Sequence, residues 1–358
     1  MSLAPAASAS TGQPIGGPQL GSPGLVVDPA APALPQGITA KGWLLADADT
    51  GDVLAARDPH GGFTPASTLK LLTAVTELPR LDPGRLVRPD PADLIVDGNK
   101  APLDPGTSYP VKDLFAYLIL RSANDAANVI AHLDGSRADT LARMNAQARR
   151  LHADDTRAMT PNGLDAPSQQ SSAYDLALIG RAALALPELA RLAGTSRMVV
   201  TGDGGRPRTI VAENKLLERY PGAIGMKTGY TVRSGGTFVG VARRGGHTLI
   251  LTLLHATPHY YPEAEHLLDW GFAALGHVHP IGTLVSPQAA RAVAAGRAPL
   301  AASATAVPAP ALPRWATVVA WFLGGFAALL VGLRVRAVRR RRAHQRRARH
   351  RARRPRSR

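Results

Sequence analysis

The chain has 358 residues, of which 45% are hydrophobic, so it is long and apolar enough to bury a sizeable core and is not a wholly disordered chain. It contains no cysteine, which excludes disulfide scaffolds, cysteine-ligated metal sites and thiol nucleophiles. Its net charge of +16 is concentrated in residues 334–358, which hold 14 arginines and no acidic residue. The first 333 residues are nearly neutral, with 28 basic and 26 acidic side chains.

Residues 1–38 contain seven prolines and no periodic apolar pattern, so we expect a flexible extended segment. From there to residue 276 the pattern is globular. Two strands are predicted around a Gly-containing turn, at 42–46 and 53–55, and two further hairpins at 198–201/209–212 and 237–242/248–254. Helices are predicted over 67–78, 111–120, 125–133, 174–186 and 187–193. Strands at both ends with helices between them predict a mixed α+β domain over residues 39–276.

The C-terminal part of the sequence is organised differently. Residues 277–314 comprise the end of the domain and an Ala/Pro-rich linker, and residues 315–333 contain no charged side chain. As a helix, these 19 residues would extend about 28 Å, close to the ~30 Å of a bilayer's hydrocarbon core, so we predict one C-terminal transmembrane helix. The arginines after it favour the cytoplasmic side, which places the rest of the chain outside the cell.

If the residues before 315 lie outside the cell, they must be exported. No basic n-region followed by an apolar h-region, the pattern of an export signal, is visible at the N-terminus. We therefore expect that the recorded start lies downstream of the true one and that a signal peptide is missing. Because the excess positive charge lies in residues 334–358, we expect no nucleic-acid partner. We interpret this tail as a cytoplasmic flank of the membrane span that also attracts anionic lipid headgroups.

The first candidate catalytic pair is Ser67 and Lys70, in the sequence S-T-L-K. Three residues apart on a helix, their side chains share a face and can meet. A serine hydroxyl needs a base to become a nucleophile, and a desolvated lysine can supply one, whereas an arginine cannot. The alternative for this short motif alone is a capping serine with an exposed helical lysine.

Two further elements follow along the chain. Ser122-Ala123-Asn124 lies in a polar break between two apolar helical runs, where a helix cap is the alternative. Lys227-Thr228-Gly229 would present a lysine and a hydroxyl on one strand face, suited to a terminal carboxylate. The glycine would let another backbone approach closely. The alternative here is an ordinary exposed strand end.

Taken in this order, S-x-x-K, S-x-N and K-T-G resemble the elements of the penicillin-recognising active-site serine enzymes. The surrounding sequence resembles one group of them, the D-alanyl-D-alanine carboxypeptidases, which are low-molecular-weight penicillin-binding proteins. The similar segments are LADADTGDVL (45–54), PASTLKLLTA (65–74), SANDAA (122–127), PNGLD (161–165) and GMKTGYT (225–231). The resemblance covers about residues 40–275. It implies a β-lactamase/penicillin-binding transpeptidase-like fold, with an antiparallel sheet flanked by helices and a helical subdomain.

The resemblance also implies the reaction. Ser67 would attack the carbonyl between the two terminal D-alanines of a peptidoglycan stem peptide, with Lys70 as general base and Ser122 relaying a proton to the departing amine. The backbone N–H groups of Ser67 and Tyr230 would form the oxyanion hole. A β-lactam would acylate the same serine, and its acyl-enzyme would break down slowly. No metal or organic cofactor is implied.

Substrate binding is implied for the remaining motif residues. Asn124 would hydrogen-bond a substrate amide, and Lys227 and Thr228 would hold the terminal carboxylate. Gly229 and Tyr230 continue the same strand, along which an extended peptide could add to the sheet edge. Many relatives carry a β-rich domain after the catalytic one, and here a Pro-rich linker leads directly to the predicted membrane span.

The sequence fits three other functions less well. A class A β-lactamase would carry a glutamate in an E-x-x-L-N loop, and residues 151–170 contain no glutamate. A metallohydrolase could use His255, His259, Glu263, Glu265 and His266, but no H-E-x-x-H motif occurs and we interpret the histidines as loop residues. A non-catalytic wall-binding protein would be expected to have lost one of the motif residues, and none is replaced.

Overall fold

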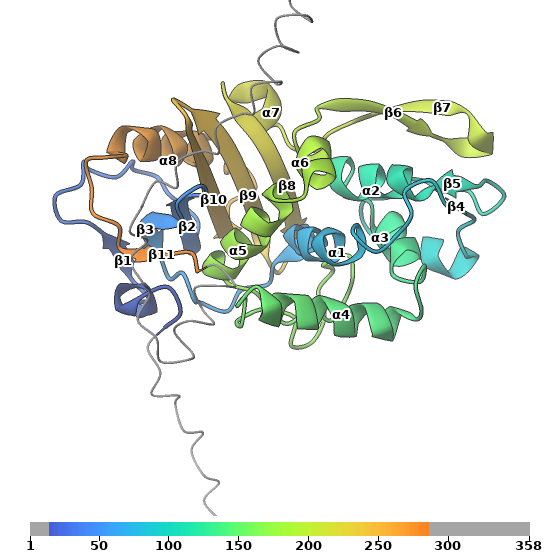
Figure 1. Ribbon diagram of the computed structural model, residues 1–358, viewed down its shortest axis with the longest axis horizontal. Helices are drawn as coiled ribbons and strands as arrows, with labels where there is room; N and C mark the ends of the chain where they lie inside the picture. The colour runs from blue at the N-terminus through green and yellow to red at the C-terminus, as the bar shows by residue number, and fades with distance from the viewer. Residues whose placement is uncertain (1–13, 286–358) are drawn as a thin grey trace, which may run out of the picture. The chain divides into compact units, whose positions relative to one another are not determined.

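The structure is a computed structural model and describes residues 14–285. Its centre is an antiparallel sheet in the order β1-β3-β2-β10-β9-β8, with β11 pairing beside β1 on the outer edge of β3 (Figure 1). The edge strand β8 carries the K-T-G motif. The strands are β1 (Leu25–Val27), β2 (Gly42–Asp47), β3 (Asp52–Arg57), β8 (Ala223–Thr231), β9 (Gly235–Arg244), β10 (His247–Ala256) and β11 (Gly282–Thr283).

The two faces of the sheet are buried under different helices. Side chains alternate between the faces with a period of two. Leu44 and Ile250 therefore belong to one hydrophobic cluster, and Leu45 and Leu251 belong to another. The first cluster includes residues of α5 (Ala173–Leu184) and α1 (Lys70–Glu77), and the second includes residues of α8 (Tyr261–Ala274). Burial on both faces explains why the central strands are apolar almost throughout.

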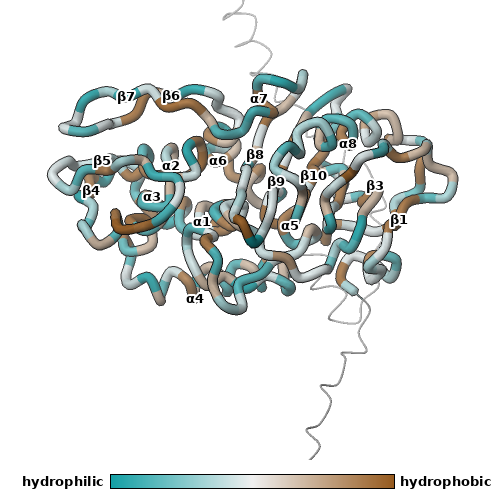
Figure 2. Tube along the Cα trace, turned by 180° about the vertical axis from the view of Figure 1, so that it is seen from behind, coloured by the Kyte–Doolittle hydropathy of each residue, from teal (hydrophilic) through white to brown (hydrophobic). Residues whose placement is uncertain are grey.

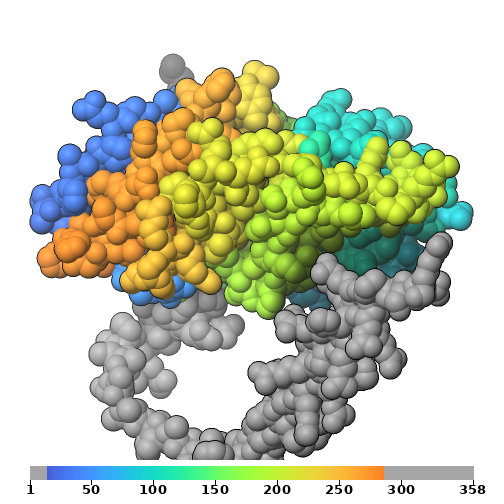
Figure 3. Space-filling model, turned by 90° about the horizontal axis from the view of Figure 1, so that it is seen from above, coloured from blue at the N-terminus to red at the C-terminus, as the bar shows by residue number. Residues whose placement is uncertain are grey.

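A helical subdomain lies beside β8 (Figure 1). Its helices are α2 (Val111–Leu120), α3 (Asn124–Ile130) and α4 (Arg137–Arg150), and α6 (Pro187–Ala193) and α7 (Leu216–Arg219) connect it to the sheet. Two small hairpins flank it: β4 (Leu86–Val87) with β5 (Tyr109–Pro110), and β6 (Arg197–Thr201) with β7 (Pro207–Val211). Figure 3 shows the β6–β7 residues lying against those of α2, and Figure 2 shows that the tip of this hairpin is hydrophilic.

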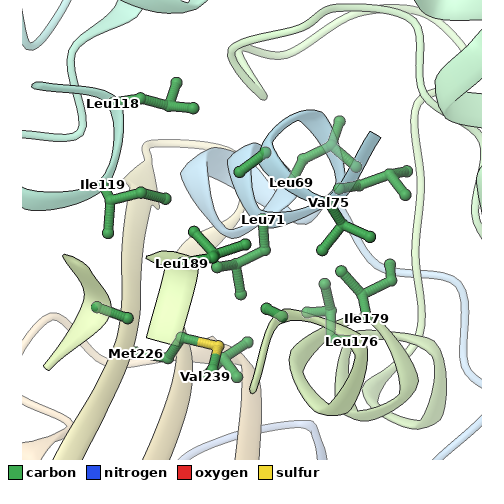
Figure 4. Close-up of a cluster of buried hydrophobic side chains, with 14 of the residues drawn as sticks. Leu69, Leu71, Val75, Leu118, Ile119, Leu176, Ile179, Leu189, Met226 and Val239 are labelled. Carbon is green, nitrogen blue, oxygen red and sulfur yellow. The ribbon is translucent and has the colours of Figure 1, made fainter. Parts of the chain in front are cut away.

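The sheet and the subdomain share one core (Figure 4). Side chains from α1 and the turn just before it, and from α2, α5 and α6, meet those of β8 and β9 there, and all of them are at most 6% exposed. These residues are Leu69, Leu71, Val75, Leu118, Ile119, Leu176, Ile179, Leu189, Met226 and Val239. Because α1 lies in the middle of this cluster, its N-terminus is held in a fixed position relative to both β8 and α3.

The predicted α+β domain is confirmed, and several of its elements match closely. The helices expected at 111–120 and 187–193 have these bounds, and both later hairpins form. The helix expected from Ser67 begins instead as the 3-10 turn η2 (Ala66–Leu69) before α1 starts at Lys70. Helix α4 was not predicted, although Ser136 and Asp139 form a capping box at its start, which is a signal readable from sequence.

The expectation of a flexible extended segment over residues 1–38 is wrong for part of that range. Leu20, in the 3-10 helix η1 (Pro18–Gly21), is fully buried, and β1 pairs with β3. A three-residue strand beside prolines has no periodicity of its own and forms only because β3 offers a free edge. The interpretation of the histidines as loop residues is wrong for two of them, since His255 lies in β10 and His266 in α8, while His259 lies in a turn.

Three predicted features lie outside the described residues: the part of the linker after residue 285, the transmembrane helix at 315–333 and the Arg-rich tail. Within residues 14–285, no helix is long and apolar enough to cross a membrane.

Candidate active site

Ser67 lies on a tight turn that is tied to the sheet. The preceding Ala66 has a φ of 48°, a left-handed conformation that non-glycine residues rarely adopt. Two hydroxyl groups hold this turn: Thr68 Oγ1, at 2.6 Å, and Thr237 Oγ1 of β9, at 2.9 Å, both donate to Pro65 O. The turn therefore places Ser67 at the start of α1 and directly against the sheet edge.

Lys70 contacts Ser67 directly. In a 3-10 turn the side chains three residues apart eclipse one another, which brings Lys70 Nζ to 2.8 Å from Ser67 Oγ. Lys70 is fully buried, and its Nζ donates to two further acceptors, Asn124 Oδ1 at 2.6 Å and Asn162 O at 2.5 Å. The predicted pairing of Ser67 with Lys70 is thus present in the structure.

These surroundings favour a neutral Lys70. Burial lowers the pKa of Lys70 well below its usual value, and the nearby positive charge of Lys227 lowers it further, while Asp125 opposes the shift. A neutral amine has two hydrogens and one lone pair. Asn124 Oδ1 and Asn162 O can only accept hydrogen bonds, so they take the two hydrogens and leave the lone pair facing the Ser67 hydroxyl. This is the arrangement that a general base for Ser67 requires.

Ser122 and Asn124 come to the same pocket from the junction between α2 and α3. Ser122 has a φ of 55°, and it is buried at the wall of the pocket described below. The Asn124 side chain is engaged at both ends, because Oδ1 accepts from Lys70 and Nδ2 donates to Asp97 O at 2.7 Å. In the structure Asn124 thus orients Lys70, in addition to lining the pocket where it is predicted to meet substrate.

Asn162 contacts the candidate catalytic lysine, and the site prediction did not include it. Its carbonyl accepts from Lys70, and its Nδ2 donates to Asn128 Oδ1 of α3 at 3.2 Å. The preceding carbonyl, Pro161 O, accepts from Thr73 Oγ1 of α1 at 2.7 Å. The P-N-G segment was noticed only for its resemblance to relatives, since a backbone carbonyl leaves no side-chain pattern from which its role can be read.

The K-T-G residues of β8 are split between the two faces of the strand. The expectation of a lysine and a hydroxyl on one strand face is wrong, because successive strand residues point to opposite sides. Thr228 lines the pocket, while Lys227 is buried and its Nζ donates to Thr228 O at 2.7 Å. Burial lowers the pKa of Lys227 to about 7, and the negative charge of Glu213 opposes this shift.

Gly229 allows the close approach that the sequence suggests. A side chain at this position would have its Cβ 2.8 Å from Ser67 N and would overlap Thr237 Oγ1. Only glycine lets β8 pass this close to the turn that carries Ser67. The next residue, Tyr230, is 56% exposed at the rim.

Together these groups surround a pocket of about 420 Å³ between β8 and the helical subdomain. Its lining contains most of the predicted site residues, and Lys70 and Lys227 lie beneath it. The lining residues are Ser67, Gly98, Asn99, Ser122, Asn124, Leu164, Glu213, Thr228, Gly229, Tyr230, Pro258, Tyr260 and Tyr261. Within residues 14–285 no group of three His, Asp or Glu side chains is placed to hold a metal ion.

A serine with a buried lysine base, a second serine and a K-T-G edge strand define the class of active-site serine enzymes that recognise penicillin. Comparison with known sequences identifies the family within that class. The profile of the D-alanyl-D-alanine carboxypeptidases, peptidase family S11, matches residues 28–257. The chain belongs to this family and is a serine peptidase with D-Ala-D-Ala carboxypeptidase function.

Individual relatives agree with this assignment. The chain is 44% identical over 241 residues to the D-alanyl-D-alanine carboxypeptidase DacB2 of Mycobacterium tuberculosis, covering 65% of this chain and 82% of that one. A solved D-alanyl-D-alanine carboxypeptidase from Mycobacterium tuberculosis H37Rv superposes with a TM-score of 0.69 at 42% identity, covering 72% of this chain and 99% of the other. The Streptomyces K15 DD-transpeptidase gives a TM-score of 0.64 at 27% identity, covering 68% and 100%. The transpeptidase-like fold is therefore shown.

Proposed function

We propose that this protein removes the terminal D-alanine from peptidoglycan stem peptides through an acyl-enzyme on Ser67. The environment of Lys70 Nζ supports this assignment of residues. Lys70 Nζ lies 2.8 Å from Ser67 Oγ, and its hydrogens are donated to Asn124 Oδ1 and Asn162 O, which can only accept. Family membership supplies the substrate class, and this contact supports Ser67 as the nucleophile and Lys70 as its base.

The reaction proceeds in two halves. Lys70 accepts the Ser67 hydroxyl proton as Oγ forms a bond to the carbonyl carbon between the two D-alanines, and the N–H groups of Ser67 and Tyr230 receive the oxyanion. The proton then passes through Ser122 to the amine of the departing D-alanine as the peptide bond breaks. Water attacks the resulting ester as Lys70 accepts its proton. Lys70 then returns that proton to Ser67 Oγ as the ester C–O bond breaks, which releases the shortened peptide and restores the Ser67 hydroxyl.

The substrate's terminal carboxylate would bind at Thr228 with the Lys227 ammonium beneath it, and a peptide amide would meet Asn124. The peptide backbone would extend along Gly229 and Tyr230 as an added strand. β-Lactams would enter by the same route and acylate Ser67. Because residues 151–170 contain no glutamate, we expect no rapid deacylation of the kind class A β-lactamases achieve.

The cellular arrangement is part of the proposal. The catalytic domain would lie outside the cytoplasmic membrane, with residues 315–333 as a single span and residues 334–358 as a cytoplasmic tail. The uncharged 19-residue stretch and the arginines that follow it support this topology. Deleting residues 339–358 should lower membrane retention or invert the topology, measured by protease accessibility of the catalytic domain in intact cells. An unchanged topology would contradict the proposed role of the tail.

Brief exposure to benzylpenicillin tests the enzymatic proposal. We expect a stable one-to-one adduct by intact mass and a parallel loss of D-alanine release from a peptide ending in D-Ala-D-Ala. Tryptic cleavage after Arg57 and Lys70 yields the peptide 58–70, which should carry the added mass because it contains Ser67. Rapid consumption of the drug without an adduct would indicate a β-lactamase instead. Intact drug and unmodified, folded protein would contradict the proposed site.

A further inference from the structure

A second cavity, of about 330 Å³, is lined by α2, β7 and the segment 100–102. Among the described residues that line it, three are cations, namely Lys100, Arg121 and Arg208, and none is acidic. Neither the three motifs nor the proposed reaction gives these cations a role. A cavity lined by cations and by no acid attracts an anion.

The Arg208 guanidinium is only partly paired. Arg208 Nη1 is buried and has no hydrogen-bond partner within residues 14–285. The Asp203 carboxylate lies 3.6 Å from it, which is beyond hydrogen-bonding distance. A buried N–H group without an acceptor costs free energy, so such groups are rare in folded proteins. Because the side chain as a whole is 39% exposed, a rotation at its end can turn Nη1 toward an acceptor in the cavity.

The other two cations also have donors left for a ligand. Arg121 Nη1 lies 2.8 Å from Glu213 Oε1 and donates to Val211 O at 3.2 Å. Both contacts use one nitrogen of a guanidinium that has five N–H donors in a fork suited to a carboxylate. Lys100 is exposed, and its Nζ donates to Leu94 O at 3.3 Å, which uses one of three ammonium hydrogens.

The cavity adjoins the active-site pocket. Arg121 lines the cavity and Glu213 lines the pocket, so their ion pair is part of a shared wall. The chain also passes directly from one lining to the other twice, from Asn99 to Lys100 and from Arg121 to Ser122. A ligand that fills the pocket and extends past this wall reaches the three cations.

The direction of β8 indicates which part of a substrate lies on this side. The proposed reaction has the terminal carboxylate at Thr228 and the oxyanion at the N–H of Tyr230. The acyl part of the peptide therefore runs toward the end of β8, and the leaving group lies toward its start. The chain passes from β7 through Glu213 and α7 into the start of β8, and β7 and α7 lie at the same end of β8 (Figure 1). The cavity beside β7 is thus on the leaving-group side.

We propose that Lys100, Arg121 and Arg208 form a second carboxylate-binding subsite, which holds a carboxylate carried by a leaving group larger than D-alanine. The second stem peptide of a cross-link is such a group, because it is joined to D-alanine through an amine and carries carboxylates of its own. The position of the broken bond rests on the proposed function. The bond is then the amide of the cross-link: the proton passed through Ser122 goes to the amine of the second stem, and water hydrolyses the ester on Ser67 as before.

Two synthetic cross-linked stem-peptide dimers test the subsite in the full chain. The second stem has a free side-chain carboxylate in one dimer and a carboxamide in the other. We expect kcat/KM for cleavage to be about tenfold higher with the free carboxylate, since the amidated dimer loses a charge-assisted hydrogen bond. Equal values would overturn the proposal. So would cleavage of neither dimer by a chain that releases D-alanine from a peptide ending in D-Ala-D-Ala.

Substitutions test the assignment of the cations. Arg208→Gln and Lys100→Gln should each bring the ratio of the two kcat/KM values toward one. Arg206→Gln is the matched control and should keep the wild-type ratio, because Arg206 is an exposed arginine on the same hairpin that does not line the cavity. If Arg208→Gln does not fold, Lys100→Gln, at an exposed position, still decides. A wild-type ratio in the folded variants, or an equal loss in Arg206→Gln, would overturn the proposal.

A binding measurement separates this proposal from the proposed function. The second stem peptide alone is titrated into the full chain by isothermal titration calorimetry, so no bond is broken. We expect the peptide with the free carboxylate to bind about tenfold more tightly than its carboxamide form, and Arg208→Gln to remove this difference. That result without any acylation by benzylpenicillin would contradict only the proposed function. Equal binding of the two peptides to the folded protein would overturn the subsite.

Discussion

Replacement of Lys70 by methionine is expected to lower the second-order rate constant for acylation by benzylpenicillin by about 10³-fold. The substitution removes the lone pair that faces Ser67 Oγ at 2.8 Å and therefore the general base. Raising the pH should not restore the rate, because no other group in the described pocket contacts Ser67 Oγ as a base. The rate is measured by intact mass after timed exposure to the drug, from pH 5 to pH 9.

Stability must be measured beside this rate. Methionine leaves Asn124 Oδ1 and Asn162 O without their buried donor, at a cost of about 1–3 kcal/mol for each unsatisfied group. Lys70→Arg is the informative second variant, since it keeps a donor but cannot lose its proton at accessible pH. We expect it to be as slow as Lys70→Met. The exposed Lys112→Met is the matched control and should retain the wild-type rate. A Lys70→Met rate within tenfold of wild type would show that Lys70 is not the base.

Replacement of Gly163 by alanine is expected to lower the same rate constant by about 10²-fold, although Gly163 does not touch the nucleophile's hydroxyl. Gly163 has a φ of 82°, and an added Cβ would overlap Ala66 O and come within 3.2 Å of Ser67 Cα. Both neighbours are backbone atoms and cannot rotate away. The segment that carries Asn162 O must therefore move relative to Ser67 and Lys70.

Gly245→Ala is the control for the backbone conformation itself. Gly245 has a φ of 59° in the turn between β9 and β10, and an added Cβ there meets nothing within 4 Å. Both variants should lose about 1–2 kcal/mol of unfolding free energy from the left-handed conformation, measured by denaturant titration. Gly163→Ala should lose more and should also be acylated slowly. Equal acylation rates in the two variants would contradict the role assigned to the Asn162 segment.

Much of the site was accessible from residue types and spacing. Ser67 and Lys70 are three residues apart, and any helical turn that holds them brings their side chains together. Glycine at position 229 indicated a close backbone approach, and the structure identifies the approaching atom as Ser67 N. The missed helix α4 had a readable capping box in Ser136 and Asp139. The Ser67–Lys70 pair and the capping box are local, because each depends on residues three apart, whereas Gly229 indicated that a backbone approaches but not which one.

Other parts of the site depend on contacts between distant segments. Asn162 O reaches Lys70 across 92 residues and Asn124 reaches it across 54, and no periodicity relates these positions. The ion pair between Arg121 and Glu213 also joins segments far apart in the sequence, and so does the pairing of β1 with the edge of β3.

By itself, the sequence determined the order of the three motifs, predicted the α+β class and proposed Ser67 and Lys70 as the nucleophile and its base, because these follow from local spacing and from a pattern that the family shares. Only the tertiary structure decided that Lys70 and Lys227 are buried, that Lys227 and Thr228 face opposite sides of β8, and that Asn162 and Glu213 belong to the site. The physical reason is that burial and charge depend on which distant segments pack together, and these quantities set whether a lysine is a base or a cation.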